Sequence, residues 1–546
     1  MIRLHNTLGN TVQDFLPQQP DKVTLYTCGP TVYSELHVGN WLAYLRWDIL
    51  VRTLQAEGYS VERVMNITDV GHLVSDADDG EDKMQKGARR EGITAWDVAA
   101  RYTESFMKGM EALGLVMPTY ITKATEHIAE QIALVQTLEA KGHTYQTSDG
   151  IYFDTSTFAA YADFAQLDLS GLKEGARVTA NDEKRHPSDF ALWKFSPAGE
   201  QRDMEWWAPW KPSDAPDDGE THTIGEARAV QPTSGQGSGE QRTEAYRSYS
   251  EGAAQSLTQP VVGSDSEVAG SAGQQAVAVR GSWGFPGWHL ECSAMAMKYL
   301  GNTLDIHTGG IDHIPVHHTN EIAQSEAATG QPFAHYWLHA NFLMVDGRKV
   351  SKSLENGHTL ADLALHGFTP VDYRMFALQS HYRTETNFTW DNLASAKARL
   401  KHWQDAAVLR WQTHDTLVDD EQKSTNETTV DLLRSVQSAH DALRNDLNTP
   451  EALKSIEEAF ALFTRSRYDT QQDAFGRVLD FVEQQLGIPL RALTPDIDDE
   501  AKQLLIERAR AREQRDWQRS DQLRQSLAGR GIAVRDDAIG QIWTYA

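Results

Sequence analysis

An apolar run that ends in Cys28 and continues through a Gly-Pro turn toward an amphipathic helix most constrains the fold of this chain. The hydrophobic pattern predicts a buried strand over Val23–Thr27, a helix over Trp41–Leu54 and a second strand over Val61–Ile67. Together these segments form a βαβ unit. Ligands of such folds bind outside the carboxyl ends of the parallel strands, so Cys28 and His37 are expected at a ligand-binding edge.

Size and charge narrow the classes of function. With 546 residues the chain is expected to form about three or four domains. It has no run of eighteen apolar residues and does not begin like a signal peptide, which predicts a soluble, cytoplasmic protein without a membrane partner. The net charge of -26 excludes general coating of nucleic acid, but a specific RNA partner can still bind a locally basic surface.

The composition and hydrophobic pattern of the sequence change twice along the chain. Residues 211–280 are rich in Gly, Ser, Gln, Asp and Pro, and such a composition predicts a disordered insertion because it buries too little apolar surface. From Ser395 onward the pattern is almost wholly helical. Lys502–Arg530 carries eight basic and four acidic residues, opposite in sign to the whole chain, and predicts one basic helix with short strands after it.

Two short motifs indicate phosphate chemistry. His37-Val-Gly-Asn40 follows the first predicted strand, where the backbone N–H groups of a helix N-terminus attract phosphate and Gly39 permits close approach. In GRKVSKSLEN, Lys349 and Lys352 bracket a small flexible stretch that can bring two ammonium groups onto a polyphosphate. Alone, the first is more typical of a structural turn and the second of a solvated charge pair. Together and in this order they are far more specific.

With these motifs the chain resembles the class I aminoacyl-tRNA synthetases, whose signatures are written HIGH and KMSKS. More closely it resembles the cysteinyl-tRNA synthetase family, over essentially the whole chain outside the low-complexity insertion. Seven segments carry the likeness, in the same order: YTCGPTVY, NITDV, DFALWK, PGWHLECSAM, HTGGIDHIPVHHTNEIAQSEA, MVDGRKVSKSLEN and NDLNTPEAL. Asn40 replaces the second histidine of HIGH, and its amide can still donate to phosphate.

The resemblance implies an α/β fold with a Rossmann-type parallel-sheet catalytic domain, an inserted connective region, an α-helical bundle and a small C-terminal domain. The expected division is 1–130 for the first half of the catalytic domain, 131–210 for the connective insertion, 211–280 for the disordered insertion, 281–345 for the second half, 346–394 for the KVSKS loop and linking region, 395–494 for a tRNA-binding helical bundle, and 495–546 for the anticodon-binding region.

The resemblance also implies one zinc ion per subunit, held by Cys28, Cys292, His317 and Glu321. The chemistry of these residues supports it independently. His317 and Glu321 are four apart in a predicted helix and so share a face, and two sulfurs, an imidazole and a carboxylate suit Zn²⁺. Without the two cysteines, a solvated helix face would be the better interpretation of the other pair. The metal is expected to select the substrate thiol.

The remaining site residues follow from the family motifs. Those expected at ATP are His37, Gly39, Asn40, Gly310, Asp312, Lys349 and Lys352, of which His37, Asn40, Lys349 and Lys352 are expected to be catalytic; Mg²⁺ is expected with ATP. Cysteine is expected at Gly29, Thr68 and Trp288, although burial of an aromatic ring also accounts for Trp288. Neighbouring histidines are often bystanders, so His313 and His318 are given no role.

The resemblance implies a cysteine–tRNA ligase that acts, as a monomer, on ATP, L-cysteine and tRNA-Cys. Candidate tRNA contacts are Arg508, Arg512, Arg515 and Arg519 near one helix face, with Trp517 and Trp543 available to stack on bases; exposed helix charge is an equal alternative. Two rival functions stay open: a ligase that joins activated cysteine to an amino sugar in thiol-cofactor synthesis, and a non-catalytic RNA-binding relative. The C-terminal match disfavours the first, and the intact lysine motif disfavours the second.

Overall fold

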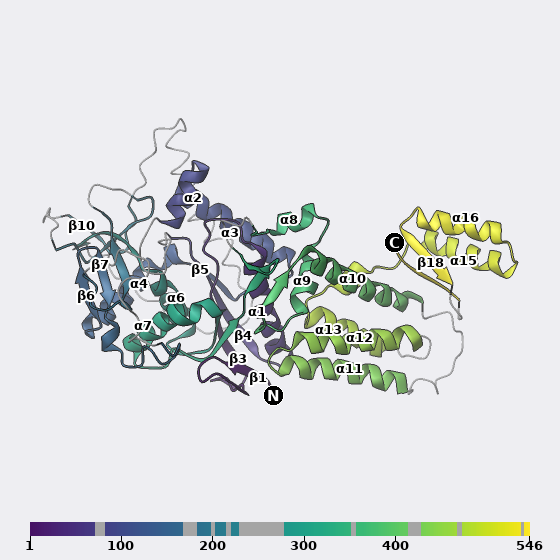
Figure 1. The fold of residues 1–546 in the computed structure, drawn as a ribbon, viewed down its shortest axis with the longest axis horizontal. Coiled ribbons are helices and arrows are strands. Elements are labelled where there is room, and N and C mark those ends of the chain that lie inside the picture. Colours follow the sequence, from purple (N-terminus) through teal and green to yellow (C-terminus); the bar gives the residue numbers. More distant parts are fainter. Residues whose placement is uncertain are drawn as a thin grey trace.

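The computed structural model describes residues 1–70, 82–167, 183–197, 202–213, 220–228, 278–350, 356–412, 427–466, 472–536 and 540–546. A large α/β body lies at one end of the molecule, a bundle of long helices follows it, and a small C-terminal domain lies at the far end (Figure 1). None of the helices in the described ranges combines the length and apolar character needed to cross a membrane.

A five-stranded parallel sheet forms the centre of the body, in the order β14-β13-β3-β4-β5. Its strands are β3 (Lys22–Thr27), β4 (Ser60–Ile67), β5 (Tyr120–Lys123), β13 (Leu304–Gly310) and β14 (Ala334–Ala340). Helix α1 (Val38–Ala56) connects β3 to β4, which confirms the predicted βαβ unit and the Rossmann-type fold class. Because β4 pairs on one side of β3 and β13 on the other, the strand order reverses at β3, and a ligand crevice is expected there.

Helices cover this sheet and fix the loops at its carboxyl edge. Both α1 and α6 (Trp288–Leu300) pack against β4, and the Trp41 ring of α1 stacks on Phe106 of α3 (Ala95–Ala112) with centroids 5.5 Å apart. The helices of the body other than α1 are α2 (Lys83–Glu91), α3 (Ala95–Ala112), α4 (Ile128–Ala140), α6 (Trp288–Leu300) and α7 (Thr319–Thr329). A short two-stranded sheet, β1 (Arg3–Asn6) and β2 (Thr11–Asp14), packs beside β14.

An antiparallel sheet in the order β6-β7-β8-β12-β9 forms the connective insertion. Its strands are β6 (Thr144–Thr147), β7 (Gly150–Phe153), β8 (Phe190–Phe195), β9 (Trp206–Ala208) and β12 (Ser282–Pro286). The proposed boundary at residue 281 therefore places β12 in the second half of the catalytic domain, although its hydrogen-bonded partners are β8 and β9 of the insertion.

The predicted disordered insertion has ordered ends. Strand β10 (Thr221–Thr223) pairs with β11 (Ala278–Arg280), and the ring of His222 contacts both Trp207 and Trp283, with centroids 4.5 and 5.0 Å apart. For these ends the prediction of disorder is wrong, because the tryptophans that contact His222 come from neighbouring segments. Residues 229–277 lie outside the described residues.

The rest of the chain is mainly helical. Strands β15 (Leu343–Val345), β16 (Arg348–Lys349) and β17 (Thr386–Phe388) and helices α8 (Leu360–Leu365) and α9 (Pro370–Leu378) lead into α10 (Trp390–Ala407), α11 (Glu427–Arg444), α12 (Thr449–Ser466), α13 (Gln472–Gln484) and α14 (Leu490–Leu493). The C-terminal domain consists of α15 (Asp499–Glu513), α16 (Trp517–Ala528), β18 (Ile532–Asp536) and β19 (Gln541–Tyr545).

The prediction of a single basic helix in this domain is wrong. The chain turns between α15 and α16 at Arg515, whose φ is +59°, and the Asp516 side chain caps the second helix by accepting from the backbone N–H of Arg519. The two helices then pack against each other side by side (Figure 1).

Candidate active site

A cavity of about 360 Å³ opens at the carboxyl ends of β3, β4 and β13, where the strand order reverses. Its size is in the usual range for small-molecule sites. Twelve of the residues that the sequence predicted for the site line it: Cys28, Gly29, His37, Gly39, Asn40, Thr68, Trp288, Cys292, Gly310, Asp312, His317 and Lys349. Of the other two, Glu321 lies behind His317, and Lys352 lies outside the described residues.

His37 and Asn40 cap the N-terminus of α1 at one side of this cavity. The Nδ1 atom of His37 accepts from the backbone N–H of Gly39 at 3.0 Å, and the Oδ1 atom of Asn40 accepts from the backbone N–H of His37 at 3.2 Å. Partial burial lowers the pKa of His37, so the ring is neutral at pH 7. Because Nδ1 accepts, the ring proton sits on Nε2, which leaves Nε2–H and the Asn40 amide as donors toward an anion.

Lys349 and Asp312 bring opposite charges to the same cavity. Lys349 ends β16, and its Nζ lies 4.7 Å from the centroid of the Phe342 ring. Asp312 is exposed in a short helix directly after β13. A Cβ on Gly310 would lie 2.3 Å from Asp312 Oδ1, so a larger residue at that position would displace the carboxylate from its present place.

The four predicted zinc ligands form one compact group. One donor atom each from Cys28, Cys292, His317 and Glu321 lies within 4.8 Å of the others. His317 Nε2 is 2.7 Å from Glu321 Oε1, and the side chains of both residues are buried. Three elements supply the four residues: Cys28 follows β3, Cys292 lies in α6, and His317 and Glu321 lie one turn apart where a π-helical turn leads into α7.

The four residues of this group shift one another's pKa values. Burial raises the pKa of the Cys28 thiol, whereas the hydrogen bond from Cys28 lowers the pKa of Cys292 to about 6. Burial opposes charge on His317, but the Glu321 carboxylate and Cys292 outweigh it and raise its pKa to about 10. A buried thiolate beside an imidazole and a carboxylate is a donor set suited to a divalent cation.

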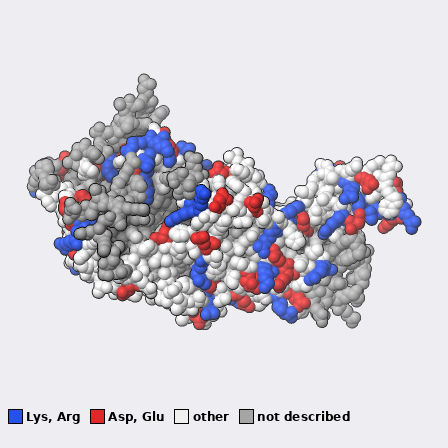
Figure 2. Space-filling model, in the orientation of Figure 1, with Lys and Arg blue, Asp and Glu red and all other residues white. Residues whose placement is uncertain are grey.

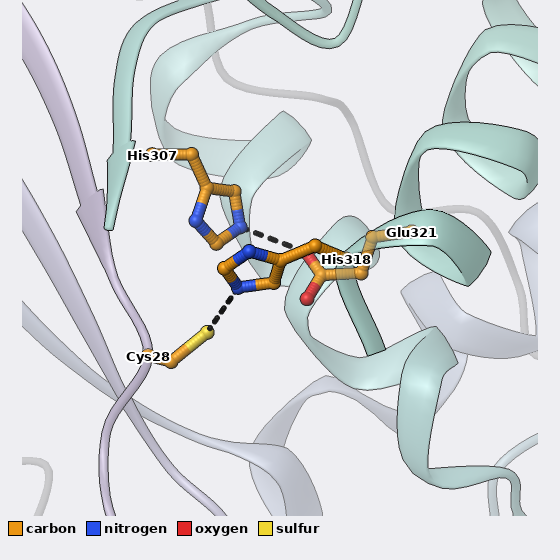
Figure 3. A group of neighbouring side chains, drawn as sticks. All are labelled: Cys28, His307, His318 and Glu321. Atoms are coloured by element: carbon orange, nitrogen blue, oxygen red, sulfur yellow. Dashed lines mark hydrogen bonds and ion pairs between the residues drawn. The ribbon is translucent and has the colours of Figure 1, made fainter. Parts of the chain in front are cut away.

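A second group overlaps the first and was missed by the sequence analysis. Cys28 and Glu321 also meet His307 and His318, again with donor atoms within 4.8 Å (Figure 3). His318 Nε2 lies 3.5 Å from Cys28 Sγ, and His307 Nε2 lies 2.8 Å from Glu321 Oε2. His307 begins the HTGGIDHIPVHH segment but was given no role, because only the pairing of β13 with β3 brings it to the site.

The predicted cysteine pocket lies next to the two thiols. The Trp288 ring stacks on His317 with centroids 4.6 Å apart and an interplanar angle of 25°. A Cβ on Gly29 would lie 1.6 Å from the backbone oxygen of Asn66, so no larger residue fits there. Thr68 follows β4 and is 2% exposed.

The candidate tRNA contacts divide into buried and exposed residues. Arg508 is 2% exposed and donates to both carboxylate oxygens of Asp536, at 2.9 and 2.7 Å, so it holds α15 against β18. Trp543 is 5% exposed in the domain core. The prediction of these two as RNA contacts is therefore wrong, because Asp536 of β18 covers Arg508 and Trp543 packs from β19 into the domain core.

The other candidates do not share one helix face, because the turn at Arg515 separates them. Arg512 pairs with Asp536 at 3.0 Å, and Arg519 of α16 pairs with Glu507 of α15 at 3.0 Å. Trp517 is 57% exposed at the start of α16. Figure 2 shows basic side chains interspersed with acidic ones over this end of the molecule.

Comparisons with known proteins agree with this architecture. A family model described as the tRNA synthetases class I (C) catalytic domain matches residues 14–214 and 271–398, and one described as the cysteinyl-tRNA ligase anticodon binding domain matches residues 494–543. Cysteine–tRNA ligase 1 of Burkholderia lata is 38% identical over 99% of this chain and 96% of its own length. The cysteine–tRNA ligase of Treponema denticola is 36% identical over 99% of each chain.

Two solved structures share the fold. The methionyl-tRNA synthetase of Mycobacterium tuberculosis in complex with methionyl-adenylate aligns with a TM-score of 0.52 and 13% identity, over 86% of this chain and 89% of its own. The Agrobacterium radiobacter LeuRS in its ternary complex with tRNA and LeuAMS aligns with a TM-score of 0.54 and 14% identity, over 88% and 86%. By its matches to the family models and to full-length relatives, the chain belongs to the cysteine–tRNA ligase family of class I tRNA synthetases.

Proposed function

We propose that this chain is a cysteine–tRNA ligase, which activates L-cysteine with ATP to cysteinyl-adenylate and transfers the cysteinyl group to the 3′ end of tRNA-Cys. The observation that carries the proposal is the joint lining of one cavity by Cys28, Cys292 and His317 on one side and by the α1 N-terminus on the other. Such a cavity can hold a thiol beside a polyphosphate, as this reaction requires.

Cys28, Cys292, His317 and Glu321 would hold one zinc ion per chain. The fit rests on their donor set, because two sulfurs, an imidazole and a carboxylate within 4.8 Å of one another suit Zn²⁺. When bound, zinc supplies a Lewis-acid position that prefers a thiolate to a hydroxyl. That preference matters because a cavity alone separates near-isosteres such as cysteine and serine by only about 10- to 200-fold.

The chain's own residues carry the activation step by positioning and charge. The cysteine carboxylate attacks the α-phosphate of ATP, the bond to the β-phosphate breaks, and pyrophosphate leaves with the displaced negative charge. His37 Nε2–H and the Asn40 amide donate to the phosphates, and Lys349 and Lys352 neutralise the charge that develops on them. Gly310 and Asp312 would hold the ribose, with Asp312 accepting from its hydroxyls. Mg²⁺ arrives with ATP.

Transfer requires tRNA, and the helical bundle and residues 495–546 would bind it, with the C-terminal domain at the anticodon. The match of the anticodon-binding family model to residues 494–543 supports this assignment. A monomer in the cytoplasm, with ATP, cysteine and tRNA-Cys as its partners, is sufficient for the reaction.

Cysteine-dependent exchange of pyrophosphate into ATP, followed by charging of tRNA-Cys, tests the proposal. We expect exchange with cysteine, at least a hundredfold less with serine, and charging of tRNA-Cys but not of an amino-sugar acceptor. Cysteinylation of the amino sugar in place of tRNA would identify the thiol-cofactor ligase. Binding of tRNA without any exchange would identify a non-catalytic RNA-binding protein.

A further inference from the structure

The turn between α11 and α12 has a strained backbone. Asp446 and Leu447 adopt left-handed conformations, with φ of +62° and +53°, and neither residue is a glycine. Such a conformation costs a non-glycine residue free energy, so it persists only where the surrounding contacts hold it. Both residues are buried, at 4% and 2% exposure. The proposed function gives this turn no task.

The Asp446 side chain is the centre of the contacts that hold the turn. Its Oδ1 accepts from the Tyr382 hydroxyl at 2.7 Å and from the backbone N–H of His5 at 2.8 Å. Its Oδ2 accepts from the Arg383 guanidinium, from Nε at 2.8 Å and from Nη2 at 2.7 Å. The Asp446 backbone N–H also donates to the C=O of Arg3 at 2.8 Å. One residue of the bundle therefore binds both β1 and the segment that follows α9.

The wall of the cavity holds Tyr382 and Arg383 from the other side. Their backbone oxygens both accept from Asn341, that of Tyr382 from its N–H at 2.8 Å and that of Arg383 from its Nδ2 at 3.1 Å. Asn341 directly follows β14 and lines the cavity. Tyr382 and Arg383 thus present their side chains to the bundle and their backbone to the catalytic site.

Asn341 is in turn fixed to the catalytic body. Its C=O accepts from Arg46 Nη1 of α1 at 2.7 Å, and its Oδ1 accepts from the N–H of Phe342 at 2.7 Å. The Tyr382 ring also contacts Trp47 of α1, with centroids 5.8 Å apart. A continuous series of hydrogen-bonded groups therefore connects the α11–α12 turn to the cavity wall.

The placement of the bundle matters most for transfer to tRNA. The bundle and the C-terminal domain would hold the tRNA, while its 3′ end has to reach the adenylate in the cavity. A misplacement of about 1 Å can slow a reaction on the order of 100-fold. Directed hydrogen bonds between a carboxylate and a guanidinium fix an orientation more strictly than apolar packing does. The contacts of Asp446 are suited to that task.

We propose that Asp446 is a positioning residue that, through Tyr382 and Arg383, sets where the helical bundle holds tRNA relative to the catalytic cavity. This inference rests on the proposed function, because it takes tRNA as the partner of the bundle. It extends that function by naming the contact that aligns the two halves of the chain for transfer, the step that follows adenylate formation.

Two reactions of the full-length, zinc-loaded protein test the inference. Cysteine-dependent pyrophosphate exchange needs no tRNA, whereas single-turnover transfer from preformed cysteinyl-adenylate to tRNA-Cys needs the two halves aligned. The variants are Asp446→Asn, which tolerates the left-handed conformation but loses one acceptor oxygen, and Tyr382→Phe, which loses only the hydroxyl. Ile132→Val, which removes one buried carbon from α4, is the control for a small loss of stability.

We expect Asp446→Asn to slow transfer about 10-fold or more, while exchange and the Kd for tRNA-Cys stay within about twofold. Tyr382→Phe should slow transfer less, because Arg383 still holds the carboxylate. Since both substitutions break the same contact, their effects should not multiply in the double variant. Ile132→Val should transfer at the rate of the parent. If Asp446→Asn does not fold, Tyr382→Phe carries the test alone, because it leaves the turn and the carboxylate in place.

Three results would overturn the inference and leave the proposed function intact. An equal loss of exchange and transfer would mean that the junction only supports the cavity wall. A weaker Kd for tRNA with an unchanged transfer rate would assign Asp446 to binding and not to alignment. Transfer at the rate of the parent in both variants would make the contact purely structural. Failure of the proposed function looks different, because the parent protein itself would then show no cysteine-dependent exchange.

Discussion

His317 Nε2 lies 2.7 Å from Glu321 Oε1, one helical turn along the chain. The other carboxylate oxygen of Glu321 accepts from His307 at 2.8 Å, so this one side chain belongs to both candidate metal groups. The two groups differ in the remaining donors, which are Cys292 and His317 in one and His307 and His318 in the other. Only the first offers two thiols, the softer donors that favour zinc.

Removal of single donors distinguishes the two groups. We expect Cys292→Ala and His317→Ala to lose zinc, and His307→Ala and His318→Ala to retain most of it with an affinity weakened about 10- to 100-fold, as for residues that orient ligands. The measurement is zinc per chain after dialysis against graded chelator. His289→Ala should retain an amount of zinc between these two extremes, because His289 Nδ1 lies 3.0 Å from the Nδ1 of His317. Loss of zinc from the His318 variant with retention in the Cys292 variant would reverse the assignment.

Arg374 joins the catalytic body to the helical bundle. Its side chain is 1% exposed, it pairs with the fully buried Asp48 of α1 at 2.7 Å, and it donates to the backbone oxygens of Leu113 and Leu486 at 3.0 Å. Arg374→Ala leaves a buried carboxylate with one partner fewer. We therefore expect the free energy of unfolding to fall by about 3–5 kcal/mol, measured by urea denaturation.

An exposed ion pair provides the control for that change. Arg101 pairs with Glu91 at 3.0 Å, but its side chain is 63% exposed. Arg101→Ala should cost less than about 1 kcal/mol. A similar small loss for Arg374→Ala would show that the buried pair does not hold the two regions together.

The sequence predicts the parts of this fold where pattern and chemistry coincide. The strand predicted over Val23–Thr27 lies within β3 and is only one residue shorter. The agreement is close because an apolar run bounded by a Gly-Pro turn has few alternative structures. The break in the basic helix could not be predicted from Gly or Pro, since neither is present, and Arg515 adopts a left-handed conformation instead. Asp516 was the available signal, because aspartate is a preferred N-cap.

The candidate site likewise contains some residues that the sequence predicts and others that it does not. Donors with a recognisable spacing, such as His317 and Glu321, could be found along the chain. His307 reaches the site only through strand pairing, and Arg508 looks like a surface cation until Asp536 of the hairpin covers it. Long-range contacts of this kind leave no local pattern in the sequence.

Asp69 should make stability depend on pH. Burial raises its pKa from 3.8 to about 6, although hydrogen bonds from the N–H and hydroxyl of Thr125 favour the charged form. Between these values the folded protein binds a proton that the unfolded chain releases, so the unfolding free energy falls as pH rises through this window. The fall is at most about 3 kcal/mol.

Asp69→Asn removes this titration and provides the test. Urea denaturation at pH 4, 5, 6 and 7 should show the variant gaining stability relative to the parent as pH rises. A constant difference between the two proteins across these pH values would mean that Asp69 has an ordinary pKa in the fold.

The exposed and the buried candidate tRNA contacts of the C-terminal domain should behave differently. Trp517 is 57% exposed, so Trp517→Ala should raise the KM for tRNA-Cys several-fold, as expected for loss of one stacked base, and leave cysteine-dependent pyrophosphate exchange unchanged.

Arg508→Ala should instead lower the melting temperature of this domain, because it breaks the buried contact with Asp536. Deletion from Pro495 onward should combine the loss of tRNA charging with intact exchange, since none of the described residues of this domain lines the catalytic cavity. Equal loss of exchange and charging on deletion would contradict the assignment of tRNA binding to this end of the chain.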